Sequence, residues 1–210
     1  SLYMTKIKAI GFDYGGVLGG DAEAGKRFKA QICELINVSM EAWESAYFSK
    51  NHLVNTGKVV SRREFWSAIL TSLDRIQFLD QAIQLDAELS SSYINLNPDM
   101  LALVDRLRLA GYKVGLLSNA SAEVAIKIRA QDVERHFDSF IISAEIGFQK
   151  PDCLAFTKLA ASLGVTIQEV AFIDDATKSL VNAAECGFTP ILFKSQPQLE
   201  TDLRQLGLTY

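Results

Sequence analysis

The sequence predicts an α/β fold: a Rossmann-like, doubly wound parallel sheet as the core, with an inserted all-helical cap domain. Three observations predict it. A single strand-like segment, 7–12, comes first, residues 21–97 then show only helical patterns, and strand and helix patterns alternate from residue 98 onward. We therefore expect a core domain formed by residues 1–20 plus 98–210, and a cap domain formed by residues 21–97.

Composition excludes several classes of function. The 210 residues are 49% hydrophobic and carry a formal net charge of −4, so a sizeable core is expected, and binding to nucleic acid or to a membrane is not. The cysteines, Cys33, Cys153 and Cys186, are odd in number and widely spaced, which favours free core thiols in a reducing compartment. The chain also begins without a signal-peptide pattern. A cytoplasmic location is predicted.

The first strand carries the most informative residue. The apolar run 7–12 ends on Asp13, and small residues, including Gly15 and Gly16, follow at once. A carboxylate at the carboxyl end of a buried strand is well placed to act as a nucleophile. Asp and Gly after a strand also commonly form a simple turn, so this segment alone leaves both interpretations open.

The segment 21–97 has apolar residues at helical spacing and no convincing strand. Ser39 and Ser61 are expected to cap two of its helices. Large aromatic residues in this segment are better explained as the core of a helical bundle than as a ligand cage. These residues are Trp43, Tyr47, Phe65 and Trp66.

Regular alternation begins at Asn97 and Pro98, which have the residue types of a helix N-cap and first helical position. Glycines at 111, 164 and 187 mark helix ends. Strand-helix units of this length predict a parallel sheet with right-handed crossovers. The expected order is helix 98–109, strand 113–117, helix 123–130, strand 140–143, helix 152–163, strand 170–173, a helix that contains Leu180 and ends at Gly187, and strand 190–193.

Polar residues follow several of these strands. In a parallel sheet the carboxyl ends of the strands meet at one edge, so these side chains should lie together. Three neighbouring carboxylates repel each other unless a cation neutralises them, and an all-oxygen acidic site suits Mg²⁺. A lysine and a hydroxyl beside them could bind a tetrahedral anion. The residues are Asp13, Ser118, Asn119, Lys150, Asp174 and Asp175.

The ordered set of segments resembles the four motifs of the haloacid dehalogenase superfamily. The segments are 12–18 (FDYGGVL), 117–119 (LSN), 147–152 (GFQKPD) and 172–175 (FIDD). The helical insertion between the first and second motifs resembles that superfamily's first type of cap. The resemblance covers essentially the whole chain.

The resemblance implies a role for each matching residue. Asp13 would be the catalytic nucleophile and a metal ligand, and the Gly15 carbonyl would also bind the metal. Ser118, with the Asn119 backbone, would hold the phosphoryl group. Lys150 would neutralise charge on nucleophile and phosphate, and Asp174 and Asp175 would position Mg²⁺.

The chain departs from the superfamily's phosphatases two residues after the nucleophile. An aspartate that protonates the leaving oxygen is usual there, and this chain has Gly15. A general acid contributes about 10²–10⁴-fold, so slow turnover or a preference for good leaving groups is expected. The metal-independent dehalogenase branch also lacks that aspartate, but it has another acid where this chain has Ser179. A third alternative is a catalytically weak regulatory protein that binds a phosphorylated ligand.

For four other polar residues, a structural role is simpler than a role in the site. Asp21 is the nearest replacement acid in the sequence, although solvation in a loop is the simpler role. Arg62 and Arg63 could reach an acidic substrate from the cap, but adjacent arginines usually form a solvated face. Glu145 is expected to form an ion pair.

Together these features predict a Mg²⁺-dependent phosphatase that hydrolyses a small organic phosphate monoester through an aspartyl-phosphate on Asp13. The expected partner is a small phosphorylated metabolite. The expected assembly is a monomer or a homodimer.

Overall fold

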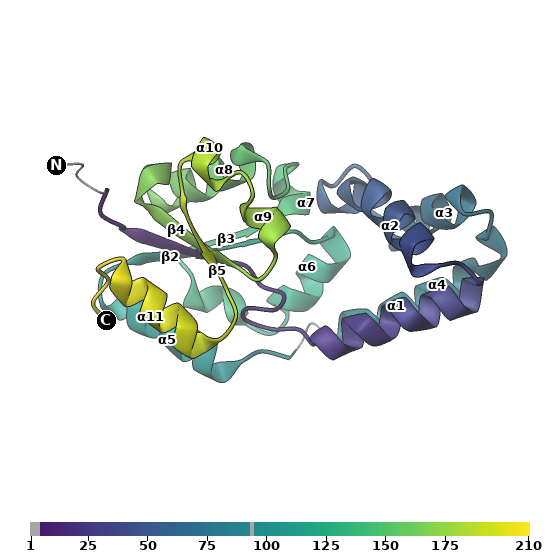
Figure 1. The fold of residues 1–210 in the computed structure, drawn as a ribbon, viewed down its shortest axis with the longest axis horizontal. Helices are drawn as coiled ribbons and strands as arrows, with labels where there is room; N and C mark the ends of the chain where they lie inside the picture. The colour runs from purple at the N-terminus through teal and green to yellow at the C-terminus, as the bar shows by residue number, and fades with distance from the viewer. Residues whose placement is uncertain (1–4, 93–94) are drawn as a thin grey trace.

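The structure, a computed structural model, describes residues 5–92 and 95–210. A parallel sheet covered by helices forms one part, and a group of helices projects from one side of it (Figure 1). The α/β fold class predicted from the sequence is therefore confirmed, including helices on both faces of the sheet.

The sheet of the described residues has five strands in the order β3-β2-β1-β4-β5, and all neighbouring pairs are parallel. The first strand in the chain thus lies at the centre, where Phe12 is in register with Leu116 on one side and Ile173 on the other. The strands are β1 (Ala9–Phe12), β2 (Lys113–Ser118), β3 (Ser139–Ile142), β4 (Val170–Asp174) and β5 (Thr189–Leu192).

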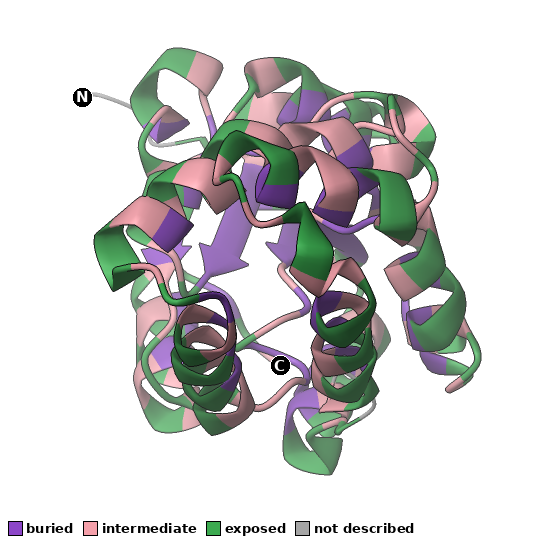
Figure 2. Ribbon diagram, turned by 90° about the vertical axis from the view of Figure 1, so that its right-hand side faces the viewer, coloured by how far each residue is buried: buried purple, intermediate pink, exposed green. Residues whose placement is uncertain are grey.

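Alternate side chains of the strands enter two separate hydrophobic clusters, one on each face. Ile10 and Phe12 pack with the first face's helices, which are α5 (Pro98–Leu109), α6 (Ala122–Arg129) and α11 (Gln196–Gln205). Ala9 and Phe172 pack with the second face's helices, α8 (Cys153–Leu163) and α10 (Ala183–Cys186). Because both faces are covered, the strands are buried throughout the centre of the sheet (Figure 2).

The strands and α-helices after residue 97 follow the predicted order, with three differences. A short helix, α7 (Ser143–Ile146), lies in the expected loop before Lys150. The helix expected to end at Gly187 is two short helices, α9 (Thr177–Leu180) and α10. Helix α11 was not predicted, although Ser195 and Gln198 form a capping box at its start.

The cap consists of helices that pack on each other rather than on the sheet. Trp43 and Trp66 stack with ring centroids 5.2 Å apart, and both are buried. Phe65 is also buried in this cluster, as predicted, and Tyr47 packs at its edge. The cap elements are α1 (Ala22–Ile36), α2 (Met40–Asn55), α3 (Arg62–Ser72), the 3₁₀ turn Ile76–Phe78 and α4 (Leu79–Ser91). The predicted caps are confirmed, since Ser39 and Ser61 accept hydrogen bonds from the first turns of α2 and α3.

The two connections between cap and core run side by side. Gly19 bridges Leu96 in antiparallel fashion, and Gly20 N–H donates to the Asn95 carbonyl at 3.1 Å. Asn97 N–H donates to the Leu18 carbonyl at 2.8 Å. The exact division between residues 20 and 21 and between 97 and 98 stays a prediction. Of the helices in the described ranges, none is long and apolar enough to cross a membrane.

Candidate active site

Three carboxylates meet at the carboxyl edge of the sheet. Asp13 directly follows β1, Asp174 is the last residue of the adjacent strand β4, and Asp175 follows it. One oxygen from each carboxylate lies within 4.8 Å of the others. The sequence placed these residues at one edge, and the structure brings them together.

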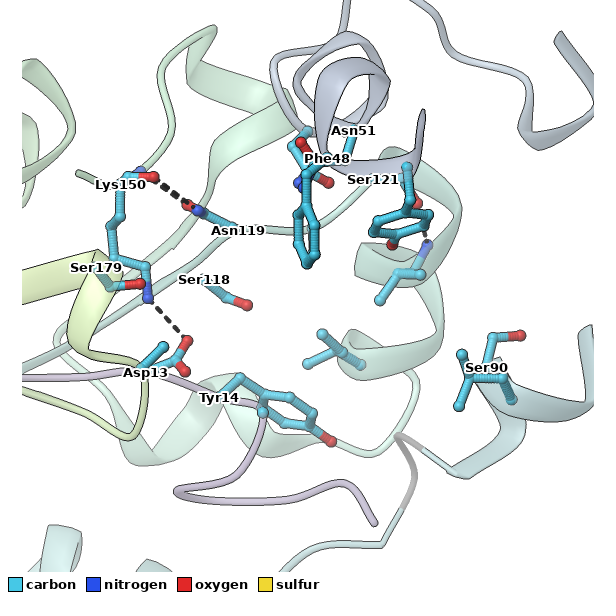
Figure 3. Close-up of a pocket in the computed structure, with 18 of the residues that line it drawn as sticks. Asp13, Tyr14, Phe48, Asn51, Ser90, Ser118, Asn119, Ser121, Lys150 and Ser179 are labelled. Atoms are coloured by element: carbon cyan, nitrogen blue, oxygen red, sulfur yellow. Dashed lines mark hydrogen bonds and ion pairs between the residues drawn. The ribbon is translucent and has the colours of Figure 1, made fainter. Parts of the chain in front are cut away.

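Lys150 enters the same cluster from the loop between α7 and α8. Its ammonium nitrogen lies 2.9 Å from Asp13 Oδ1 and 2.6 Å from Asp174 Oδ2, and its side chain is 2% exposed. Burial alone would lower the pKa of Lys150, but Asp13 and Asp174 outweigh it and raise the pKa above its ordinary value. Lys150 is therefore held in its charged form between the two acids. Figure 3 shows its ion pair with Asp13.

Asn119 holds the backbone of Lys150 in place. Its Nδ2 donates to the Lys150 carbonyl at 3.0 Å, and its Oδ1 accepts from Lys150 N–H at 2.9 Å. The Asn119 side chain thus anchors the loop that carries Lys150. Ser118, the last residue of β2, is 5% exposed and faces the same space (Figure 3).

The acids remain electrostatically under-compensated. Burial raises the pKa of Asp13 to about 7, with Asp174 and Asp175 adding to the effect and Lys150 opposing it. Burial, followed by the charge of Asp174, also raises the pKa of Asp175. One lysine beside three carboxylates leaves an excess of negative charge when all are ionised, and a divalent cation bound by oxygen ligands would remove it. The donor set therefore fits Mg²⁺.

Gly16 allows the acids to approach the backbone after the nucleophile. Its φ is +76°, which favours glycine, and a Cβ at this position would collide with the Asp175 carboxylate. Gly15 differs, because a Cβ there would meet nothing within 4 Å. The two adjacent glycines thus have different structural requirements.

A cavity of about 290 Å³ opens beside the acids. The predicted residues that line it are Asp13, Gly15, Ser118, Asn119, Lys150 and Asp174, with Asp175 adjacent in the acid cluster. Their proximity agrees with the predicted site. Their individual roles stay predictions.

The cap and helix α9 contribute lining residues that the sequence did not identify. Arg62 was expected on a solvated face, and this is wrong: it is 15% exposed, lines the cavity and donates two hydrogen bonds to Asp86 at 2.9 and 2.6 Å. The two residues come from α3 and α4, and only their packing brings them together. Phe48 of α2 and Lys178 of α9 also line the cavity.

Asp21 and Glu145 have structural partners. Asp21 accepts hydrogen bonds from Glu23 N–H and Ala24 N–H, so it caps α1. Glu145 pairs with Arg129, as expected. Neither residue belongs to the lining of the cavity.

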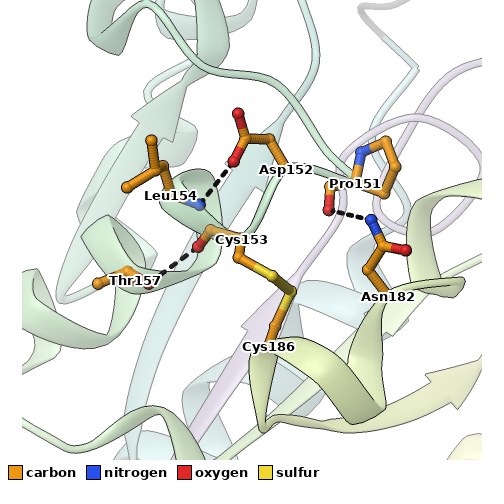
Figure 4. The surroundings of a disulfide bond; sticks show 7 residues. All are labelled: Pro151, Asp152, Cys153, Leu154, Thr157, Asn182 and Cys186. Carbon is orange, nitrogen blue, oxygen red and sulfur yellow. Dashed lines mark hydrogen bonds between the residues drawn. A yellow bond between two sulfur atoms is a disulfide. The ribbon is translucent and has the colours of Figure 1, made fainter.

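The expectation of three free thiols is wrong. Cys153, the first residue of α8, forms a disulfide with Cys186, the last residue of α10 (Figure 4). Cys33 is free. The two cysteines are separated by 33 positions in the sequence, and the packing of α10 on α8 brings them together. Asn182 Nδ2 also donates to the Pro151 carbonyl at 3.1 Å, so the segment after Lys150 is tied to the region of α10.

Comparison with known proteins gives a family. A family model described as haloacid dehalogenase-like hydrolase matches residues 7–186. The match begins before β1 and ends at α10, so it includes the acids, Lys150 and the whole cap.

Two curated relatives have different activities. A phosphatase, MT3486 of Mycobacterium tuberculosis, is 28% identical over 96% of this chain and 95% of its own length. An (S)-2-haloacid dehalogenase of Burkholderia cepacia is 29% identical over 63% of this chain. That match spans about 60% of the dehalogenase's length.

Solved structures share the fold. A haloacid dehalogenase family enzyme of Bacteroides thetaiotaomicron, solved in complex with magnesium and inorganic phosphate, superposes with a TM-score of 0.65 at 24% identity. That comparison covers 90% of this chain and 96% of the other.

Proposed function

The chain belongs to the haloacid dehalogenase-like hydrolases, and on that premise we propose that it is a Mg²⁺-dependent phosphatase of small organic phosphate monoesters. The observation that carries the proposal is the grouping of Asp13, Asp174 and Asp175 around a single compensating lysine. Such a surplus of carboxylates suits a site that holds a dication and a phosphoryl group together.

Asp13 would act as the nucleophile. A carboxylate oxygen of Asp13 attacks the phosphorus, the bond between phosphorus and the ester oxygen breaks, and that oxygen leaves with the electron pair and takes a proton from water. A second water then attacks the phosphorus, the bond to Asp13 breaks, and inorganic phosphate is released with the carboxylate restored. The two steps together consume one water for each ester hydrolysed, because the proton taken from the first water is returned when the second is deprotonated.

Neighbouring residues would prepare this attack. Lys150 orients Asp13 through Oδ1 and places a positive charge beside the phosphoryl oxygens. The Ser118 hydroxyl and the Asn119 backbone would bind the transferred group. Asp13, Asp174, Asp175 and the Gly15 carbonyl would hold Mg²⁺, whose charge would favour ionised Asp13 and stabilise charge on the phosphoryl oxygens.

This chain lacks an acidic residue that the dehalogenase alternative would need. Ser179, at the position where that branch has an acid, lines the cavity and is 7% exposed. A buried hydroxyl cannot replace an ionised carboxylate, and the third carboxylate, Asp175, has no evident use in a metal-free site. The phosphatase proposal gives Asp175 a use as a metal ligand and requires no acid at position 179.

Hydrolysis of p-nitrophenyl phosphate with Mg²⁺ or with EDTA tests the proposal, using the wild type and Asp13→Asn. We expect turnover only with Mg²⁺, and a loss of at least about 10³-fold in Asp13→Asn. Asp132→Asn is a matched control, since Asp132 is exposed, lies outside the cavity lining and has a φ of 58° that asparagine accepts. A phosphorylated form of the wild type, trapped by acid quench and located on Asp13 by mass spectrometry, would identify the intermediate.

The same preparation separates the alternatives. Equal rates for wild type and Asp13→Asn across sugar and nucleotide phosphates would overturn the proposal. Halide release from a 2-haloacid in EDTA would support the dehalogenase. Tight binding of a phosphorylated ligand without product would support the regulatory protein.

A further inference from the structure

A cap residue and a core residue are in contact at the edge of the cavity. The Lys178 ammonium of α9 lies 4.1 Å from the centre of the Phe48 ring of α2, and both residues line the cavity that contains Asp13. Figure 3 shows Phe48 extending from its helix into the space above Ser118. The pair therefore borders the same cavity as the candidate nucleophile.

Phe48 is unusual among the cap's aromatic residues. It is 45% exposed, whereas Trp43, Phe65 and Trp66 are at most 2% exposed. Exposing a large ring is unfavourable unless something covers it, and this ring is part of the lining of the cavity. It is positioned to pack against the carbon skeleton of a small ligand.

Lys178 differs from the other cations that line the cavity. Arg62 is held by Asp86, and Lys150 is held by Asp13 and Asp174. Among residues 5–92 and 95–210, no carboxylate oxygen lies within 4.0 Å of the Lys178 ammonium. Its charge is thus available to an anionic ligand, and Phe48 holds it at the cavity.

We infer that Phe48 and Lys178 are specificity-determining residues, which select phosphate esters whose leaving group carries a second acidic group. Lys178 would form a charge-assisted hydrogen bond to that group, and Phe48 would cover the carbons between it and the phosphoryl group. A cavity of about 290 Å³ restricts the ester to a small one. The inference rests on the proposed function for the placement of the phosphoryl group against Asp13 and Lys150.

Binding of matched phosphonates tests the inference without turnover. The probes are propylphosphonate, 3-phosphonopropionate and 1,3-propylenediphosphonate, which share a carbon chain and differ in the second group. Titration calorimetry with Mg²⁺ should give a Kd at least about tenfold lower for one of the acidic probes than for propylphosphonate. Comparison of 3-phosphonopropionate with 1,3-propylenediphosphonate shows whether a carboxylate or a phosphonate is preferred as the second group.

Variants assign the preference to these residues. Lys178→Met should reduce the ratio of acidic to neutral affinity about tenfold, and Lys178→Arg should restore it to within about threefold of the wild type. Phe48→Leu should weaken binding of all three probes. Lys158→Met is the matched control, because Lys158 also lies over a ring, that of Phe148 at 5.9 Å, but outside the cavity lining. It should keep the wild-type ratio.

Turnover measurements distinguish failure of the specificity inference from failure of the proposed phosphatase function. Wild type should hydrolyse 3-phosphoglycerate with a higher kcat/KM than glycerol 3-phosphate, and Lys178→Met should lose this preference mainly through KM. Asp13-dependent turnover without any acidic preference, or a preference that Lys178→Met retains, would overturn the inference and leave the proposed function intact. Absence of turnover with an intact, Lys178-dependent phosphonate preference would overturn the proposed function alone.

Discussion

Gly15 lies two residues after the candidate nucleophile, and the structure leaves room for a side chain there. It lines the cavity, and a Cβ would meet no atom within 4 Å. Gly15→Asp should therefore fold and supply a general acid to the leaving oxygen. We expect kcat for alkyl phosphates to rise by about 10²-fold, at the low end of what a general acid contributes.

The dependence of rate on leaving-group pKa is the appropriate measurement. Wild type should slow steeply as the leaving group becomes a poorer one, and Gly15→Asp should flatten this dependence because the leaving oxygen is protonated. Gly15→Asn has nearly the same shape without the acid and should resemble the wild type. A slope unchanged in Gly15→Asp would show that no acid is missing at this position.

Asp138 stabilises the sheet in a pH-dependent way. Its carboxylate accepts from Val114 N–H at 2.9 Å and from Arg108 at 3.0 Å. Burial alone would raise the pKa of Asp138, but the Val114 hydrogen bond and Arg108 outweigh it and hold the pKa below its ordinary value of 3.8. The stabilisation is therefore complete above the ordinary pKa and is lost as the pH falls through the lower pKa of the folded state.

Asp138→Asn should lower the free energy of unfolding by about 1–2 kcal/mol at neutral pH. The difference from the wild type should shrink as the solution is acidified below the ordinary pKa, since the wild-type carboxyl then becomes neutral as well. Urea unfolding at a series of pH values measures this. A difference that stays constant into strong acid would show that charge is not its source.

At the scale of elements, the disulfide joins α8 to α10. It closes a loop of 33 positions, and such a cross-link stabilises by roughly 3–4 kcal/mol through the entropy of the unfolded chain. Replacing both Cys153 and Cys186 by Ser should lower the free energy of unfolding by about that amount under oxidising conditions. Dithiothreitol should remove the difference from the wild type.

Cys33→Ser is the matched control for this measurement. Cys33 is free, so its replacement should leave the effect of dithiothreitol unchanged. If dithiothreitol has no effect on wild-type unfolding, the two thiols are reduced in the isolated protein.

Elements were predictable where local signals and periodicity agreed. Helix α5 has its cap, Asn97, and its first-turn proline, Pro98, in the expected places, because these are local interactions. Helix α11 has equally local signals in Ser195 and Gln198, with Leu199 and Leu203 on one face. This helix was therefore predictable from the sequence, although it was not predicted. The break between α9 and α10 carries no such signal.

The contacts in the site also fall into two groups, those that the sequence could predict and those that it could not. Strand ends in a parallel sheet necessarily share an edge, so the meeting of Asp13 with Asp174 followed from the predicted topology. The Arg62 and Asp86 pair, the Phe48 and Lys178 contact and the disulfide join separate elements through the packing of helices. No spacing in the sequence specifies those distances.

At the scale of the whole molecule, the excess negative charge at the sheet edge should make stability depend on Mg²⁺. At a concentration about 100 times Kd, binding adds roughly 2.7 kcal/mol, which corresponds to a rise in Tm of about 5–10 °C for a chain of this size. EDTA should reverse the rise. Differential scanning fluorimetry over a Mg²⁺ series measures it.

Asp175→Asn tests whether this effect comes from the acid cluster. Removal of one of the three carboxylates should abolish most of the rise in Tm, and Na⁺ at equal ionic strength should not produce it in the wild type. An equal Mg²⁺ response in Asp175→Asn would place the ion elsewhere.

The paired connections between cap and core have an evolutionary consequence. Leu18 and Asn97 are hydrogen-bonded neighbours although the entire cap separates them in the sequence. An insertion whose two ends meet at one point can be lengthened, shortened or exchanged without disturbing the strands that carry the acids. The acid cluster, with Lys178 beside it, and the cap side of the cavity, with Phe48, are therefore encoded in separable stretches of the gene, and recombination could replace the cap side in a single event.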